Sequence, residues 1–176
     1  MNIEYEVRVL EINKEKLIKK LEELGAEFKG DNEQKRYVYD IIPKEDGKWI
    51  RLRTNGKITT LAYKNVVKTT IDGTKELEVE VSDFEKTNEL LDYIGIKSKG
   101  YQENRRIQYI LNGVEIDIDS WPMIPPYVEI EGKNEEEVVR ILELLDLQNE
   151  KVTSLDVESI YKSYGIDLAS IKVLKF

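Results

Sequence analysis

The chain has 176 residues, of which 40% are hydrophobic and 35% are charged, and its formal net charge is −8. It contains neither Cys nor His, which excludes disulfides, thiolate metal sites and any catalytic triad that relies on imidazole. These numbers predict a single domain over residues 1–176 with its own core, and the acidic balance argues against binding of duplex nucleic acid.

The first expected elements are a strand and a helix. Apolar residues occupy one face of segment 2–10 and charged residues the other, which is the two-residue period of a strand. Leucine and isoleucine at helical spacing follow, with Asn13 as the predicted N-cap and Gly25 as the predicted stop.

The rest of the chain predicts seven more strands and three more helices. The strands are expected at residues 33–42, 48–54, 57–64, 75–81, 102–111, 114–121 and 127–132. Asn-Gly pairs at 55–56 and 112–113 predict tight hairpins, and the polar segment 65–74 reads as a mobile loop. The helices are expected after Ser82-Asp83-Phe84-Glu85, which has capping-box form, after Asn134, and over residues 153–164.

Hairpin links between most strands predict an α+β domain built on one large antiparallel sheet. Carboxylates share a face on four strands: Glu4 and Glu6; Glu76, Glu78 and Glu80; Glu115, Asp117 and Asp119; Glu129 and Glu131. Cations stand on other strands, at Arg51, Arg53, Lys64 and one of the adjacent pair Arg105 and Arg106.

On a single strand, such a charged face is typical of a sheet with one side in water. The charged faces recur on many strands, and the opposite faces of those strands are strongly apolar. This pattern favours a closed or nearly closed sheet with helices outside and charges inside. A charged interior is costly unless it is neutralised, and a polyanion with a divalent cation would neutralise it. Arg and Lys match phosphate oxygens, and carboxylates hold Mg²⁺ or Mn²⁺.

The ordered motifs resemble one known family. Glu4-Tyr5-Glu6-Val7-Arg8 is similar to the N-terminal ExExK signature of the CYTH superfamily, the triphosphate tunnel metalloenzymes. The similarity continues nearly to the end of the chain, through RLR at 51–53, ELEVE at 76–80, ENRR at 103–106, EIDID at 115–119, VEIE at 128–131 and KSY at 162–164.

The resemblance implies an eight-stranded antiparallel β-tunnel and a set of site residues. The implied metal ligands are Glu4, Glu6, Asp119, Glu129 and Glu131, and the ion is Mg²⁺ or Mn²⁺. The implied phosphate-binding residues are Arg8, Arg51, Arg53, Lys64, Arg106 and Lys162, with Glu4, Glu6, Arg8 and Lys64 taken as catalytic.

The chain departs from the family pattern at two positions. Arg8 stands where Lys is usual, which keeps the charge but changes its hydrogen-bond geometry. Arg36 stands where relatives often carry Asp, so the role of its strand is left open. Trp49 and Trp121 are read as core residues in preference to walls of a base pocket.

The expected function is a divalent-metal-dependent enzyme acting on a small-molecule triphosphate: tripolyphosphate, ATP or thiamine triphosphate. Hydrolysis is ranked first; a class IV adenylyl cyclase and a non-enzymatic module for phosphorylated ligands are the alternatives. No apolar run approaches membrane-spanning length and residues 1–9 do not resemble a signal peptide, so we expect a cytoplasmic monomer or homodimer without a membrane partner.

Overall fold

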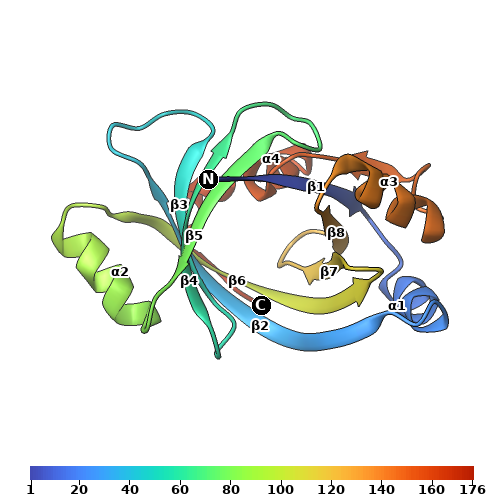
Figure 1. Ribbon diagram of the computed structural model, residues 1–176. Helices are drawn as coiled ribbons and strands as arrows, with labels where there is room; N and C mark the ends of the chain where they lie inside the picture. The colour runs from blue at the N-terminus through green and yellow to red at the C-terminus, as the bar shows by residue number, and fades with distance from the viewer.

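Eight strands close into an antiparallel barrel in a computed structural model that describes residues 1–176 (Figure 1). The strands are β1 (Asn2–Leu10), β2 (Glu27–Asp40), β3 (Lys48–Thr54), β4 (Thr59–Val66), β5 (Thr74–Glu80), β6 (Ser98–Leu111), β7 (Val114–Ser120) and β8 (Tyr127–Gly132). Their order around the barrel is β6-β2-β3-β4-β5-β1-β8-β7, and pairing of β7 with β6 closes the ring. The predicted eight-stranded tunnel of α+β class is confirmed.

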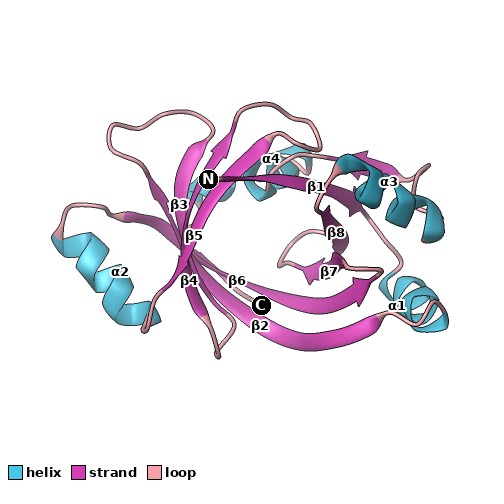
Figure 2. Ribbon diagram, in the orientation of Figure 1, coloured by secondary structure: helices cyan, strands magenta, loops and turns pink.

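The helices lie outside the barrel and cover parts of its outer face (Figure 2). They are α1 (Lys14–Glu23), α2 (Phe84–Tyr93), α3 (Glu135–Leu144), α4 (Val157–Ser163) and the short 3₁₀ helix η1 (Leu168–Ser170). In the view of Figure 1, α1 and α3 lie at one end of the molecule and α2 lies at the other. No helix is both long enough and apolar enough to cross a membrane.

The main core lies between the barrel wall and α1 and α3. On β1 the buried Val7 and Val9 face this core, whereas Glu4, Glu6 and Arg8 alternate with them and point into the barrel. Strand periodicity therefore puts apolar side chains under the helices and charged side chains in the interior. Two smaller clusters pack α4 and η1 over one mouth of the barrel and α2 over β3.

Several sequence-based predictions about local structure agree with the structure. Asn13 and Asn134 cap α1 and α3 by accepting hydrogen bonds from backbone N–H groups three residues later. The hairpin between β6 and β7 turns at Asn112 and Gly113, whose φ angles of 53° and 84° suit a tight turn of the mirror-image type.

Other predicted boundaries were wrong. β2 begins at Glu27 because a bulge between Phe28 and Gly30 allows pairing with β6 to continue past the polar residues, and β6 itself begins at Ser98. The last helix starts only at Val157, capped by Asp156, because β9 (Lys151–Thr153) pairs with β1 before it.

Three further details were not predicted correctly. The N-cap of α2 is Asp83, which accepts from Lys86 N. The segment between β4 and β5 is tied down, since Ile71 O accepts a hydrogen bond from Glu6 N and Gly73 O accepts one from Val67 N. The short β10 (Val173–Leu174) pairs in parallel with β6.

Candidate active site

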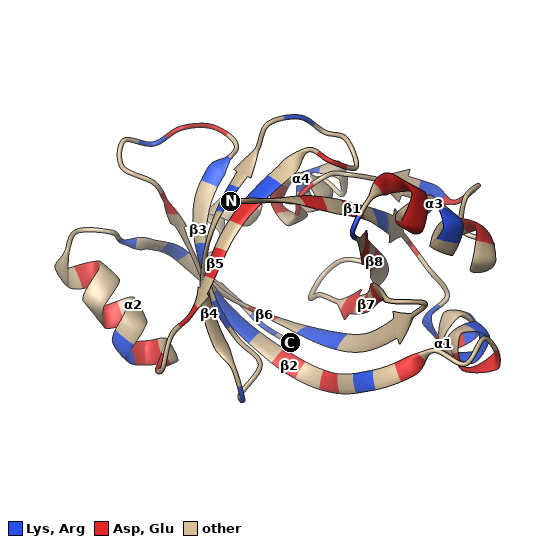
Figure 3. Cartoon of the chain, in the orientation of Figure 1, with Lys and Arg blue, Asp and Glu red and all other residues tan.

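Acidic and basic residues both occur along the strands that form the barrel (Figure 3). The barrel interior holds two cavities that share part of their walls. One, the α4-side cavity, has a volume of about 340 Å³ and is also lined by residues of α4 and η1; the other, the acidic-side cavity, has a volume of about 580 Å³. Both are lined by one set of residues, here called the waist: Glu6, Gln34, Arg51, Arg53, Lys64, Arg106 and Glu129. The two cavities therefore form a tunnel that passes through a charged waist.

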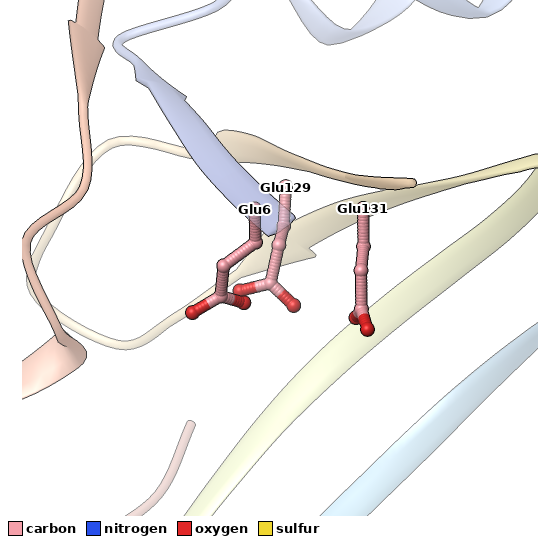
Figure 4. Close-up of side chains that lie close together, drawn as sticks. All are labelled: Glu6, Glu129 and Glu131. Carbon is pink, nitrogen blue, oxygen red and sulfur yellow. The ribbon is translucent and has the colours of Figure 1, made fainter. Parts of the chain in front are cut away.

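Two carboxylates of the waist and Glu131 beside them form an acidic cluster of Glu6, Glu129 and Glu131 (Figure 4). Glu6 on β1 is paired in register with Glu131 on β8, and Glu129 lies two residues before Glu131 on the same face. One oxygen from each lies within 4.8 Å of the others. Carboxylate oxygens in this number are the donors that hard divalent cations prefer.

Glu131 differs from its two neighbours because no cation pairs with it. Burial, and the nearby charges of Glu129 and Glu6, raise the pKa of Glu131 to about 7. A divalent cation would relieve this repulsion, so the residues present fit a metal ion.

Arg8 joins the acidic cluster to the segment before α4. Its Nη2 lies 2.5 Å from Glu129 Oε2 and 3.2 Å from Glu6 Oε1, and its Nη1 donates to Leu155 O at 2.9 Å. Although burial acts in the opposite direction, Arg8 and Arg106 lower the pKa of Glu129, which is therefore ionised at neutral pH.

Arg106 is held by a second group of carboxylates. Its Nε and Nη2 donate to the two oxygens of Asp119 at 2.8 and 2.6 Å, and it also pairs with Asp117 and, at 3.3 Å, with Glu129. Asp119 is fully buried and also accepts from Asn104 Nδ2 at 3.1 Å. Parity decides which arginine enters the tunnel: Arg106 lies inside, as predicted, and the adjacent Arg105 pairs outside with Asp31.

Lys64 connects the N-terminal strand to β5. Its Nζ lies 2.9 Å from Glu4 Oε2 and 3.1 Å from Glu76 Oε2, and Glu76 also pairs with Arg51 at 3.0 Å. Burial and a hydrogen bond to Glu76 raise the pKa of Glu4 to about 9. Glu4 therefore belongs to a lysine-centred network and lies outside the acidic cluster of Glu6, Glu129 and Glu131.

The arginines of β3 reach across small residues of β4. Arg51 is paired in register with Ala62, which leaves room for its guanidinium to approach Glu76 and Glu78 on β5. Arg53 has only one ion pair, at 3.7 Å from Glu78. The charge of Arg51, together with burial, lowers the pKa of Arg53 to about 10, so this part of the wall carries excess positive charge.

Arg36, whose role the sequence leaves open, lines the α4-side cavity. Its guanidinium lies 4.3 Å from the centroid of the Trp121 ring, and its Nε donates to Gln102 Oε1 at 2.8 Å. Arg36 lies two residues after Gln34 and therefore on the same face of the strand. This alternation is the sequence signal that could have placed Arg36 in the tunnel. Trp121 is 4% exposed, as expected of a core residue, yet it also lines this cavity, as does Trp49.

The structure brings most of the sequence-predicted site residues to the tunnel. Those that line one or both cavities are Glu4, Glu6, Arg8, Arg51, Arg53, Lys64, Arg106, Glu129, Glu131 and Lys162. Lys162 stands on α4 at the mouth of the α4-side cavity. Asp119 lines neither cavity, because it is buried and bound to Arg106.

Comparison with known proteins agrees with this architecture. The PH1012 protein from Pyrococcus horikoshii OT3 is 30% identical, with a TM-score of 0.75 over 88% of this chain and 96% of its own. A candidate adenylate cyclase from Vibrio parahaemolyticus is 14% identical, with a TM-score of 0.78 over 92% and 98% of the two chains. The candidate adenylyl cyclase HpAC1 from Hippeastrum, described as having a dominant triphosphatase activity, is 16% identical, with a TM-score of 0.63 over 97% and 99%.

The last two likenesses concern the fold alone. None of the curated proteins compared with the chain matches it significantly in sequence. The family model for the CYTH domain matches residues 2–164. The resemblance inferred from the sequence motifs is thereby confirmed, and the chain belongs to the CYTH family of triphosphate-tunnel proteins.

Proposed function

We propose that this protein is a divalent-metal-dependent enzyme that hydrolyses a triphosphate inside the tunnel. One observation carries the proposal: the acidic-side cavity is lined both by a carboxylate that no cation pairs with and by a guanidinium whose single ion pair is long. Glu131 has no cationic partner, and Arg53 has one long contact. A triphosphate bound together with a divalent cation supplies both missing charges.

The acidic cluster would hold the ion, through Glu6, Glu129 and Glu131. Mg²⁺ or Mn²⁺ suits the all-oxygen donor set of this cluster, and the absence of Cys and His removes the usual sulfur and nitrogen ligands from the chain. When bound, such an ion supplies stabilisation of negative charge on the phosphate oxygens. Glu4 and Asp119, also predicted as ligands, would act indirectly, by positioning Lys64 and Arg106.

The cationic side chains would bind and orient the phosphate chain. Arg51, Arg53 and Arg106 present planar N–H groups at the waist, which match phosphate oxygens in pairs. They would stabilise the charge that develops on the equatorial oxygens as the terminal phosphoryl group is transferred. Lys64, fixed between Glu4 and Glu76, adds a point charge on the same wall.

In hydrolysis, a water oxygen would attack the terminal phosphorus while the bond from that phosphorus to the bridging oxygen breaks. The products are orthophosphate and the remaining diphosphate. Because the chain has no His, the side chains that can accept the proton from this water are the tunnel carboxylates.

A second candidate is adenylyl cyclase activity, in which the 3′-hydroxyl of ATP attacks the α-phosphorus and pyrophosphate leaves. Trp49 and Trp121 in the wall of the α4-side cavity favour this candidate, since aromatic faces stack on bases. The same cavity is compatible with an organic triphosphate that is hydrolysed.

The test is product analysis with tripolyphosphate, ATP and thiamine triphosphate, each with Mg²⁺ or Mn²⁺ and with EDTA as a control. We expect metal-dependent release of orthophosphate, lost in Glu131→Gln and retained in Arg105→Gln, whose guanidinium lies outside the tunnel. Cyclic AMP with an equal amount of pyrophosphate would instead establish the cyclase. Binding without any product would leave a phosphate-binding module and refute both enzymes.

A further inference from the structure

Arg36 has hydrogen-bonding capacity that nothing in the protein uses. On β2 it is paired in register with Arg53 of β3 and Gln102 of β6, so its side chain enters the tunnel between these two strands. Its Nε donates to Gln102, but its two terminal nitrogens have no hydrogen-bond partner and no carboxylate within ion-pair distance. Of the five N–H groups of this guanidinium, four therefore remain free at the wall of the α4-side cavity.

Two further polar atoms in the wall of the same cavity are also without partners. Trp121 Nε1 and Tyr127 Oη are both buried and make no hydrogen bond, and both residues line the α4-side cavity. Trp121 and Tyr127 are only 4% and 1% exposed. An indole N–H can only donate a hydrogen bond, and a phenol hydroxyl can also donate one. The unused donors in this wall therefore suit a ligand rich in acceptor oxygens.

The electrostatics of this wall agree with an anionic ligand. Burial, together with the charges of Arg51 and Arg53, lowers the pKa of Arg36 to about 9, so the group remains a cation at neutral pH. The Trp121 ring covers one face of the guanidinium and holds its plane in place. The N–H groups at its edge stay free for a ligand in the cavity.

The position of Arg36 separates it from the waist. Arg51, Arg53 and Arg106 line both cavities, whereas Arg36, Trp121 and Tyr127 line only the α4-side cavity. A phosphate group bound by Arg36 therefore lies on the α4 side of those bound at the waist and away from Glu131, which lines only the acidic-side cavity.

We propose that Arg36, with Trp121 and Tyr127, forms an additional oxyanion subsite that binds the phosphate group of a linear chain lying nearest to the α4 mouth. Arg36 is then a specificity-determining residue that favours long phosphate chains over short ones. This inference rests on the proposed function, because it assumes that a phosphate chain occupies the waist.

The experiment measures binding of inorganic diphosphate, tripolyphosphate and tetraphosphate by calorimetry in EDTA, where the subsite consists of protein groups only and no turnover occurs. The variants are Arg36→Gln and Trp121→Phe, which keeps an aromatic ring but removes Nε1. Arg105→Gln is the matched control, because it removes the same charge from the adjacent outer face of the wall. Thermal melts verify that each variant is folded.

In Arg36→Gln we expect the affinity ratio of tetraphosphate to diphosphate to fall by about tenfold or more, the value of a charged hydrogen bond, with diphosphate affected by about twofold or less. Trp121→Phe should lower the same ratio in a smaller degree, and Arg105→Gln should not change it. A smaller fall in Arg36→Gln, or an equal loss for all three chains, overturns the subsite and indicates a structural or long-range electrostatic role. If the wild-type protein binds none of the chains in EDTA, the same titrations are made with Mg²⁺, and absence of both binding and turnover there would refute the proposed function.

Discussion

Glu131 shows how an unpaired charge marks a site. Several tunnel carboxylates are neutralised by a cation within the protein, as Glu129 is by Arg8 and Glu76 by Arg51. Glu131 is left without such a partner, and its pKa of about 7 reflects its burial and the neighbouring charges of Glu129 and Glu6. The same free energy favours a cation that enters the cluster.

Metal affinity should therefore depend on pH. Below pH 7 Glu131 holds a proton in the metal-free protein, and an incoming ion must displace it. We expect the affinity for Mn²⁺ to fall up to about tenfold per pH unit below about pH 7, measured by calorimetry between pH 5.5 and 8.5.

The variant Glu131→Gln removes both the ligand and the titrating group. Its Mn²⁺ affinity at pH 8 should be about 10- to 100-fold lower than that of the wild type, with a flatter pH dependence. An affinity of the wild-type protein that does not change between pH 6 and 8 would show that Glu131 does not bind the ion.

At the scale of elements, α4 connects the core to the tunnel mouth. Tyr161 is fully buried, its hydroxyl donates to Pro122 O at 2.7 Å, and its ring meets Trp121 edge-on at 6.3 Å. The same helix carries Lys162 at the mouth of the α4-side cavity. The contacts of Tyr161 on α4 with Pro122 and Trp121 therefore set the position of the part of the tunnel wall that includes Trp121.

Tyr161→Phe should lower the free energy of unfolding by about 1 to 2 kcal/mol, because it removes a buried hydrogen bond and leaves Pro122 O without a partner. The control is Tyr164→Phe, one residue past the same helix, whose hydroxyl donates to Glu11 at 3.1 Å at the surface; its effect should be within about 0.5 kcal/mol. Urea denaturation measures both. Equal effects of the two variants would mean that the bond to Pro122 does not stabilise the α4 docking.

At the scale of the whole molecule, closure of the barrel concentrates charge in a small volume. The interior brings carboxylates from β1, β5, β7 and β8 against cations from β2, β3, β4 and β6.

In the metal-free protein, ionisation of Glu131 lowers the stability of the fold. Its pKa is higher in the fold than the ordinary value of 4.5, so the stability present below pH 4.5 is lost as the pH rises through about 7.

Ligands that complete the charge balance should stabilise the whole fold. Mg²⁺ together with diphosphate, which a triphosphatase leaves unhydrolysed, at 100 times its dissociation constant should add about 2.7 kcal/mol and raise the Tm by about 5–10 °C at pH 8. Sodium chloride of the same ionic strength is the control, and differential scanning calorimetry is the measurement. A Tm that rises no more with the ligands than with the salt would contradict specific binding in the tunnel.

The sequence by itself determined the barrel and the face that each charge occupies. Alternation on β1 assigns Val7 to the core and Glu6 to the interior, because successive side chains of a strand point to opposite sides. The same rule allowed only one of Arg105 and Arg106 to enter the interior, and the family resemblance selected Arg106, which the structure places inside. The order of acidic and basic motifs then sufficed to indicate the family.

Only the tertiary structure decided which charges meet. Glu4 and Glu6 lie on the same face of the same strand, yet Glu4 pairs with Lys64 whereas Glu6 joins Glu129 and Glu131, because different neighbouring strands flank the two ends of β1. The stacking of Arg36 on Trp121 was equally hidden, since it depends on β2 and β7, which ends just before Trp121, lying on either side of β6 in the closed barrel. Parity along a strand is a local property of the chain, but the partners of a side chain depend on strand order and register, which are set by contacts far apart in the sequence.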